Sequence, residues 1–505
     1  MIQKITRTLL TGYYRPVKKF LTDPQGTQQK TLDYLVRHGR NTLYGKENNF
    51  ESVRGSSDFA VRVPVISYEE LRPWLDRIIL QKQGNVLWDT PVKWFAMSSG
   101  TTEDKSKYIP VTRESLYNGN YRAGYHMMGI YAHHYPDTAF VLGKTLVLGG
   151  SQQMNRIGGD FYTGDISAIL MKNLPAAAKS RRTPESIALL PDWEEKLRRL
   201  TDYAVKADIR AMVGVPSWML VLLKKIVAET GCTIPQLWPK LEVFFHGGVG
   251  FSPFQEQYEK LIPSGKMRYW ETYNASEGFF GVQFSPASKD MLLLLDNEVY
   301  YEFIPAGEWD KQAPVAIPIG EVETGKQYAV VISTSGGLWR YRIGDTVEFT
   351  STNPYLFRIT GRTKQFINAF GEELIVDNAD KAIGEACRRT GAKMVEYTAA
   401  PVYFGENSNG AHEWLIEFEI EPDNGIDGFA SILDESLKQL NSDYEAKRSY
   451  NLSLGMPRIK AMEKGTFYDW MKHRGKAGGQ NKVPKLSNDR KYVDSILDFI
   501  ASKGE

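Results

Sequence analysis

The sequence has little cysteine, no long apolar run and almost no excess of charge. Its two cysteines, Cys232 and Cys387, have no partners at a metal-binding spacing, which argues against a disulfide framework and a zinc site. The most apolar helix-like run, residues 218–227, contains Lys224 and Lys225 and is far shorter than the roughly 20 apolar residues of a membrane span. Because the N-terminus also lacks the pattern of a signal peptide, we expect a cytoplasmic protein without a membrane partner.

The net charge of the chain bears on which partners to expect. The chain has 62 Lys and Arg residues against 60 Asp and Glu residues, a formal net charge of +2. No overall field therefore points to nucleic acid as a partner, although the C-terminal region is locally basic. A length of 505 residues exceeds one ordinary core and predicts at least two domains.

Strand and helix signals alternate through residues 90–285, which favours an α/β sheet. Short apolar runs at residues 94–97, 142–150 and 241–245 have the character of buried strands that end in glycine or Ser-Gly-Thr turns. We expect a large α/β domain over residues 1–360.

The pattern of expected helices and strands changes near residue 358. Helices are expected at residues 377–390 and 429–444, with strands between them, and a segment at residues 465–485 is expected to end in a basic, glycine-bearing loop. This pattern predicts a small α+β domain over residues 361–505.

The first motif is Ser98-Ser99-Gly100-Thr101-Thr102, and Lys107 follows it. Hydroxyl groups, a glycine that lets backbone N–H groups approach an anion, and a lysine behind them are suited to phosphate. The spacing is not that of a Walker loop. Taken alone, the motif is equally consistent with a solvent-exposed turn.

The second motif is Tyr273-Asn274-Ala275-Ser276-Glu277-Gly278. An aromatic ring can stack on a nucleobase, a serine hydroxyl can reach a phosphate, and a carboxylate is a hard oxygen ligand for Mg²⁺. The third motif, Tyr341 to Asp345, ends in a carboxylate that could accept hydrogen bonds from both hydroxyls of a ribose. A strand end with a surface glutamate and a turn aspartate are the structural alternatives.

Two further motifs contain lysines. Gly361-Arg362-Thr363-Lys364 lies where the composition changes, and the run from Gly478 to Lys485 contains Lys482. A lysine on a flexible segment can be brought to a charged transition state by domain movement. A solvated tail residue is the alternative for Lys482.

In this order, the five motifs resemble those of the acyl-adenylate-forming superfamily. More closely, the chain resembles the plant auxin-responsive Gretchen Hagen family of acyl-acid amido synthetases and its bacterial relatives. Residues 42–46 (Thr-Leu-Tyr-Gly-Lys) and the stretch 63–73 match the N-terminal pattern of that family, which the wider superfamily does not share. The resemblance covers roughly residues 23–485.

The resemblance implies ATP and Mg²⁺ as cofactors and a set of nucleotide contacts. Gly247 and Gly248 would flank the adenine, and Tyr273 would stack on it. Ser276 would bind the α-phosphate, Glu277 would bind Mg²⁺, and Asp345 would hold the ribose. The loop over the ATP phosphates would be formed by Ser98, Ser99, Thr101 and Thr102.

Three lysines would act in catalysis. Lys107 matches the lysine that closes the phosphate loop, Lys364 falls at the interdomain hinge, and Lys482 matches a mobile lysine that contacts the carboxylate and the α-phosphate. The resemblance further implies a large adenylate-forming N-terminal domain and a small C-terminal domain that rotates between half-reactions. The family loop usually has two glycines where Glu103 and Asp104 stand.

The sequence thus predicts an ATP-dependent acyl-acid amido synthetase that conjugates a carboxylic acid to an amino acid or another amine, as a monomer. The alternatives are an acyl-CoA ligase and a non-catalytic nucleotide-binding protein. Residues 121–131, 152–162 and 215–219 contain aromatic and methionine side chains that would suit an apolar acid or would simply be core. Arg122 is interpreted as a partner for a second carboxylate or as a surface arginine.

Overall fold

The computed structural model describes the chain except for residues 1, 100–105, 149–154, 158–159, 191, 252–253, 264, 310, 312, 364, 405–408, 449–453, 475–482 and 504–505. It divides into two compact units. Unit 1 contains residues 1–98 and 108–363, and unit 2 contains residues 99–107 and 364–505.

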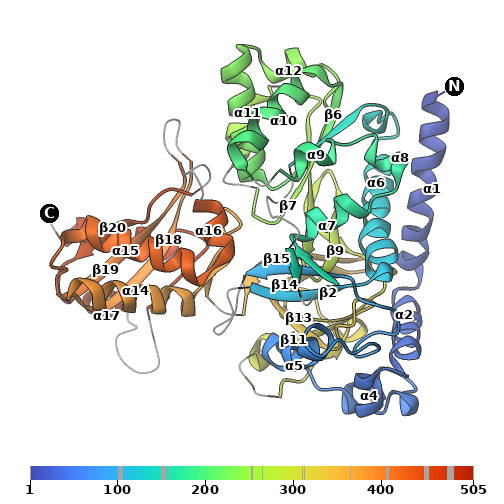
Figure 1. The fold of residues 1–505 in the computed structure, drawn as a ribbon, viewed down its shortest axis with the longest axis horizontal. Helices are drawn as coiled ribbons and strands as arrows, with labels where there is room; N and C mark the ends of the chain where they lie inside the picture. Colours follow the sequence, from blue (N-terminus) through green and yellow to red (C-terminus); the bar gives the residue numbers. More distant parts are fainter. Residues whose placement is uncertain are drawn as a thin grey trace. The chain divides into compact units, whose positions relative to one another are not determined.

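Unit 1 is built around one large mixed sheet (Figure 1). The strands follow the order β12-β11-β13-β14-β15-β10-β9-β8-β7-β6-β3. Four neighbouring strands, β3, β6, β7 and β8, run parallel, and the others pair antiparallel. The strands are β3 (Lys144–Leu148), β6 (Ile209–Gly214), β7 (Val243–Gly247), β8 (Arg268–Ala275), β9 (Gly278–Ser285), β10 (Ser288–Leu293), β11 (Val299–Pro305), β12 (Ile317–Pro318), β13 (Gln327–Thr334), β14 (Tyr341–Thr352) and β15 (Tyr355–Arg362).

A second, four-stranded sheet has the order β2-β1-β5-β4. Its strands are β1 (Trp94–Ser99), β2 (Ser106–Val111), β4 (Asn155–Ile157) and β5 (Phe161–Gly164). The strand β1 pairs parallel with β5 and ends where the predicted phosphate-binding loop begins.

Helices cover the large sheet, and in Figure 1 α1 runs beside α6. The two helices approach closely because Gly129 has no side chain, since a Cβ there would lie 2.6 Å from the backbone of Tyr13. The helices of this unit are α1 (Ile2–Thr22), α2 (Pro24–Gly39), α3 (Leu43–Glu47), α4 (Ser56–Arg62), α5 (Tyr68–Ile79), α6 (Arg122–His134), α7 (Ile166–Asn173), α8 (Ala176–Lys179), α9 (Glu185–Ala188), α10 (Trp193–Lys206), α11 (Pro216–Thr230), α12 (Ile234–Leu237) and α13 (Gln255–Leu261). A π-helical segment, η2 (Ser115–Tyr121), precedes α6.

An aromatic core joins the N-terminal segment to the large sheet. Trp339 is fully buried, its ring packs edge-on against Phe50 at 4.7 Å between centroids, and its indole N–H donates to the Leu87 carbonyl oxygen at 3.0 Å. Tyr44 is also buried in this core. The stretches that carry the family resemblance thus pack beside the strands that carry the third motif.

Unit 2 has a three-stranded sheet, β18-β19-β20, and a short hairpin, β16-β17. The strands are β16 (Phe366–Ile367), β17 (Leu374–Ile375), β18 (Lys393–Val402), β19 (Ala411–Ile420) and β20 (Arg458–Met462). The helices are α14 (Val376–Thr390), α15 (Gly425–Leu440), α16 (Ser442–Arg448), α17 (Thr466–His473) and α18 (Lys491–Lys503).

The predicted fold class, a large α/β part followed by a small α+β part, is confirmed. Individual elements differ from the prediction. Within the segment at residues 465–485, whose end is expected to be a loop, the first part forms α17. The expected helix at residues 429–444 is two helices, α15 and α16.

Candidate nucleotide-binding site

The parallel strands of unit 1 all point their carboxyl ends at one edge of the sheet. The register pairs Gly214 with His246 and Gly247 with Thr272, so the turns after β6, β7 and β8 lie side by side. Ligands of open α/β sheets bind beyond this edge. Two of the predicted nucleotide-contact regions, Gly247-Gly248 and the second motif, therefore come together beside the turn that follows Gly214.

Gly247 ends β7 and Gly248 follows it, and each position requires glycine for a different structural reason. A Cβ on Gly247 would lie 2.4 Å from the carbonyl oxygen of Thr272, so this position is closed by the neighbouring strand. Gly248 has a φ of +85°, which favours glycine, and its Cβ would meet only the Val215 side chain at 3.4 Å. Only Gly248 therefore leaves backbone beside which a flat ligand could approach.

Asp345 lies between two hydrogen-bond donors. The Tyr273 hydroxyl donates to Oδ2 at 2.7 Å, and the Arg362 Nε donates to Oδ1 at 2.7 Å. The register of β14 with β15 pairs Asp345 with Arg362, whereas Tyr273 comes from β8. Burial, and then the charge of Asp345, raise the pKa of Tyr273, so the phenol stays protonated and remains a donor.

This arrangement holds the Asp345 carboxylate in place and still leaves it able to accept further hydrogen bonds. An ionised carboxylate has about four acceptor positions on its two oxygens, and the two donors found among the described residues occupy two of them. The Asp345 side chain is 14% exposed and that of Arg362 is 20% exposed. A partly open carboxylate with acceptor capacity left can receive the two hydroxyls of a ribose.

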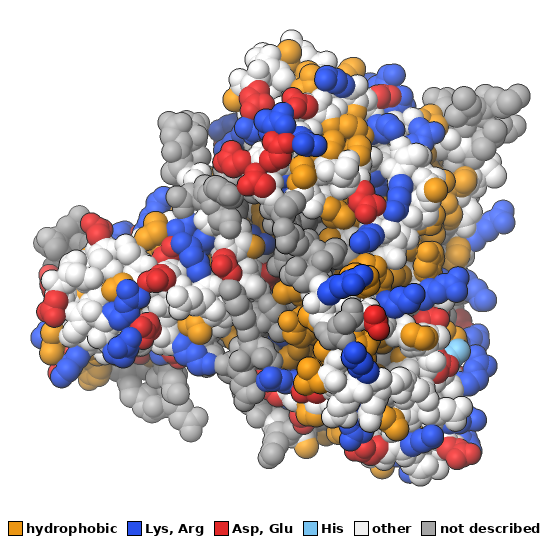
Figure 2. Space-filling view, in the orientation of Figure 1, with side chains coloured by type: hydrophobic (Ala, Val, Ile, Leu, Met, Phe, Trp, Pro, Cys, Tyr) orange, Lys and Arg blue, Asp and Glu red, His pale blue; other side chains and the backbone are white. Residues whose placement is uncertain are grey.

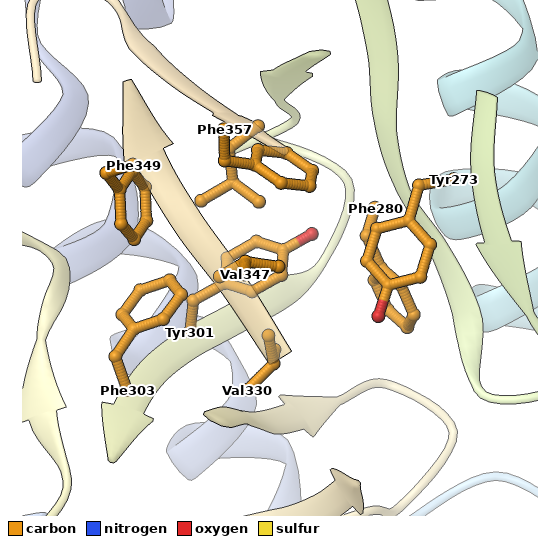
Figure 3. A pocket seen from close by; sticks show the side chains of 9 residues that line it. Tyr273, Phe280, Tyr301, Phe303, Val330, Val347, Phe349 and Phe357 are labelled. Atoms are coloured by element: carbon orange, nitrogen blue, oxygen red, sulfur yellow. The ribbon is translucent and has the colours of Figure 1, made fainter. Parts of the chain in front are cut away.

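The ring of Tyr273 belongs to an aromatic cluster. It is 6% exposed and lies 5.2 Å from Phe280 and 6.0 Å from Phe357 between ring centroids. Figure 3 shows these rings among the side chains that line a cavity. The volume of this cavity is about 10 Å³, which is no larger than one water molecule. This cavity is a gap in an apolar core and too small for a substrate. The stacking of Tyr273 on adenine stays a prediction.

The turn between β8 and β9 meets the end of β1. The Ser276 hydroxyl donates to the Met97 carbonyl oxygen at 3.3 Å, immediately before Ser98. The second motif and the start of the first are therefore neighbours within unit 1, as a shared phosphate site would require.

Glu277 lies in the same turn and is partly buried. Its charge contributes, after burial, to the raised pKa of the Tyr341 phenol on β14. No cluster of three or more Asp, Glu, His or Cys side chains that could hold a metal occurs among the described residues. A single carboxylate fits Mg²⁺ that takes its remaining ligands from phosphate oxygens and water.

The remaining predicted residues are only partly described. Lys107 lies on β2 and Ser99 ends β1, but the side chain of Ser99 lies outside the described residues. Thr101, Thr102, Lys364 and Lys482 also lie outside them, as do Glu103 and Asp104. Their roles stay predictions.

Two arginines differ from the sequence interpretation. Arg362 was noted for its motif, and its pairing with Asp345 was not anticipated. The hairpin from residue 341 to 362 would have suggested it, had the strand register been known. Arg122 is partly buried and donates to the Asp296 carbonyl oxygen at 2.8 Å, so it is not a simple surface arginine.

Figure 2 shows both basic and acidic side chains on the visible face. Cys232 and Cys387 are both free thiols. In the described part of the chain, no helix combines the length and hydropathy needed to cross a membrane.

Three models of one protein family match most of the chain. The GH3 family N-terminal domain matches residues 14–267, its central domain matches residues 292–362, and its C-terminal domain matches residues 377–491. Asp345 and Arg362 lie in the matched central segment, whereas Tyr273 lies between the N-terminal and central segments.

Curated relatives extend over nearly the full length. An indole-3-acetic acid-amido synthetase of Arabidopsis thaliana, GH3.4, is 23% identical, and the alignment covers 95% of this chain and 92% of the relative. A 4-substituted benzoates-glutamate ligase of the same plant, GH3.12, is 21% identical, with 97% and 98% covered.

A solved structure shares the fold. The structure of AtGH3.15 acyl acid amido synthetase in complex with 2,4-DB has a TM-score of 0.62 and 19% identity, and the match covers 97% of this chain and 96% of that chain. The architecture of a large N-terminal and a smaller C-terminal domain is thus the one found in that enzyme.

Proposed function

The chain belongs to the GH3 family of adenylate-forming acyl acid amido synthetases, the Gretchen Hagen family of the sequence resemblance, and from this premise we propose that it joins a carboxylic acid to the amine of an amino acid. The observation that supports the proposal most directly is Asp345, held by Tyr273 and Arg362 beside the ligand edge of the parallel strands. A nucleotide is the ligand that this carboxylate and the neighbouring glycine turns fit.

The first half-reaction is the attack of the acid's carboxylate oxygen on the α-phosphorus of ATP. A P–O bond to the acid forms, the bond to pyrophosphate breaks, and pyrophosphate leaves with its electron pair. No general base is needed, because the carboxylate is already ionised. Catalysis here consists of positioning the reactants and stabilising charge.

The residues of this chain have separate tasks in that step. Asp345 binds the ribose hydroxyls, and Ser276 contacts the α-phosphate at the end of β1. Lys107 and Lys482 neutralise the charge that develops on the phosphate oxygens and on the acid. Glu277 would hold Mg²⁺, which when bound would neutralise charge on the phosphates.

The second half-reaction is the attack of an unprotonated amine on the acyl carbon. A C–N bond forms, AMP leaves from the same carbon, and the amine loses a proton. We propose that residues 361–505 rotate between the two half-reactions around a hinge near Lys364, which removes Lys482 from the reaction centre. Residues 1–360 would bind ATP and the acid throughout, in a cytoplasmic monomer.

The proposal is tested with MgATP and pooled aryl, indole and aliphatic carboxylic acids. Each pool is incubated with no acceptor, with mixed amino acids or with coenzyme A, and the release of AMP and pyrophosphate is followed. We expect acid-dependent AMP release that rises with amino acids, together with an amide of matching mass. Stimulation by coenzyme A with a thioester product would replace the proposal with an acyl-CoA ligase.

Replacement of the mobile lysine checks the mechanism. Lys482→Ala should slow acid-dependent pyrophosphate release by roughly 10²- to 10³-fold, because one charge-stabilising group is lost from the transition state. Lys472→Ala, an exposed lysine on α17, is the matched control and should leave the rate unchanged. Normal pyrophosphate release by the Lys482→Ala variant would refute the role of that lysine.

A further inference from the structure

The segment at residues 63–68 is hydrogen-bonded to two strands, β14 and β2. Ile66 forms an isolated parallel bridge to Tyr341 at the start of β14. Its N–H donates to the Arg340 carbonyl oxygen at 3.0 Å, and its carbonyl oxygen accepts from the Arg342 N–H at 2.9 Å. The segment is therefore attached to the strand that carries Asp345.

The buried side chain of Arg340 adds further hydrogen bonds to this attachment. Its guanidinium makes two hydrogen bonds to the Glu302 carboxylate, both at 2.8 Å, and donates to the carbonyl oxygens of Ala60 and Val63 at 2.8 and 2.6 Å. The Arg340 side chain is only 5% exposed and its backbone φ is +43°. The four acceptors fix the guanidinium group, which thereby connects β14 to residues 60 and 63 at the start of this segment.

Tyr68 connects the same segment to β2. Its ring is buried, with 4% exposure, at the first position of α5, whose start is fixed by a capping box between Ser67 and Glu70. The backbone N–H of Tyr108 donates to the Tyr68 hydroxyl oxygen at 2.9 Å. Tyr108 directly follows Lys107 on β2, the strand that returns from the predicted phosphate-binding loop.

We propose that Tyr68 is a positioning residue for the triphosphate: its hydroxyl fixes the β2 backbone next to Lys107 relative to the strand of the ribose-binding Asp345. The two strands are 230 or more residues apart in sequence, and the hydrogen bonds of Ile66 and Tyr68 join both strands to the same short segment. The proposal rests on the proposed use of ATP and adds a residue that lies outside the five motifs of this sequence.

The predicted signature is a difference between ATP and AMP. A lysine beside the β- and γ-phosphates acts on ATP and has nothing to bind in AMP. Loss of the Tyr68 hydroxyl frees the Tyr108 N–H and loosens β2 at Lys107, so that triphosphate binding weakens while ribose and adenine binding are unaffected. A general loss of packing would weaken both nucleotides equally.

The test compares Tyr68→Phe with Tyr44→Phe in the full-length protein. Tyr44 is the matched control because it is a buried tyrosine of the same core, 2% exposed, whose hydroxyl has no hydrogen-bond partner among the described residues. MgATP and AMP affinities are measured by titration calorimetry, and the exchange of the Tyr108 amide hydrogen is measured in both variants.

For Tyr68→Phe we expect the MgATP affinity to fall about tenfold, the AMP affinity to stay within about twofold, and the Tyr108 amide to exchange faster. Tyr44→Phe should change none of these. An unchanged MgATP affinity in Tyr68→Phe, or equal losses for MgATP and AMP, overturns the proposal.

Failure of the proposed function has a different signature. If wild-type protein binds MgATP but does not release AMP with any of the acids, the amido synthetase proposal fails. The ratio of MgATP affinity to AMP affinity then still decides the role of Tyr68. If wild-type protein binds neither nucleotide, the role of Tyr68 is overturned as well.

Discussion

Two arginine–carboxylate pairs on the large sheet have similar distances and different environments. Arg340 and Glu302 are bound at 2.8 Å with side chains 5% and 3% exposed. Arg362 and Asp345 are bound at 2.7 Å with side chains 20% and 14% exposed. The framework pair, Arg340–Glu302, also binds backbone oxygens, whereas the site pair, Arg362–Asp345, has the Tyr273 hydroxyl as its third member.

The two pairs differ in whether their carboxylate can still accept hydrogen bonds from a ligand. The framework pair is closed, and burial raises the pKa of Glu302 even though the positive charge of Arg340 opposes that shift. In the site pair, solvent reaches the Asp345 carboxylate, and two donors from the described part of the chain leave some of its acceptor positions open. We infer that burial separates a pair that holds the chain together from the pair that we propose to bind the nucleotide.

The largest expected effect comes from breaking the framework pair. Arg340→Met leaves the Glu302 carboxylate buried without its partner, which should lower the free energy of unfolding by about 3–5 kcal/mol. Urea denaturation followed by tryptophan fluorescence measures the loss. Arg362→Met is the matched control, and we expect it to lower stability by less than about 1 kcal/mol because solvent reaches that pair.

Equal losses of stability in the two arginine variants would contradict the distinction between framework and site. A second check adds Glu302→Leu to Arg340→Met. The double variant should recover part of the lost stability, because it no longer buries an unpaired charge. It should not recover all of it, since the carbonyl oxygens of Ala60 and Val63 still lose a donor.

The next effect comes from the site pair. Asp345→Asn should lower kcat/KM for ATP in acid-dependent pyrophosphate release by about 10²-fold, because hydrogen bonds to a charged acceptor contribute roughly 1.5–3 kcal/mol each. Stability should change little. The measurement is steady-state kinetics at saturating acid, with urea denaturation of the same sample. A large loss of stability with normal kcat/KM would assign Asp345 to the framework.

The residues of the candidate site could be identified from the sequence, but the contacts between them could not. The motifs around Tyr273 and Asp345 were identified from residue types, but their hydrogen bond joins residues 72 positions apart. That contact depends on the order of strands β8, β9, β10, β15 and β14 in the sheet. Strand order and register are set by long-range packing, which local periodicity does not contain.

The role of Tyr68 illustrates the same limit. The stretch at residues 63–73 was identified through the family resemblance alone, and its composition gives no reason for its function. Its contact with Tyr108 follows from the bridge between Ile66 and Tyr341 and from the start of α5, both of which require the folded chain. Helix signals such as the Ser67–Glu70 capping box are local and readable in sequence.

The smallest expected effect is the pH dependence of the framework pair. Burial raises the pKa of Glu302, so the folded protein binds this proton more tightly than the unfolded chain does. The associated stability is present below the ordinary pKa of the carboxyl and is lost as pH rises through the raised value. Relative to Glu302→Gln, wild-type protein should therefore lose free energy of unfolding as pH rises.

Urea denaturation of wild-type protein and the Glu302→Gln variant across the acidic range checks this sign. A wild-type advantage that grows with pH would mean that the attraction of Arg340 outweighs burial. Glu302 would then resemble Asp434 of unit 2, whose pKa is lowered because the hydrogen bonds from Arg448 and Lys438 outweigh the opposing effect of burial.

The most direct test of the account is a search for the acyl-adenylate itself. Wild-type protein is mixed with MgATP and an accepted acid without amine, quenched, and analysed by mass spectrometry, and a second sample receives amino acids before the quench. The account predicts an acyl-adenylate in the first sample and its replacement by an amide and AMP in the second. Formation of ADP and an acyl phosphate, or of an adenylate that only coenzyme A consumes, would contradict it.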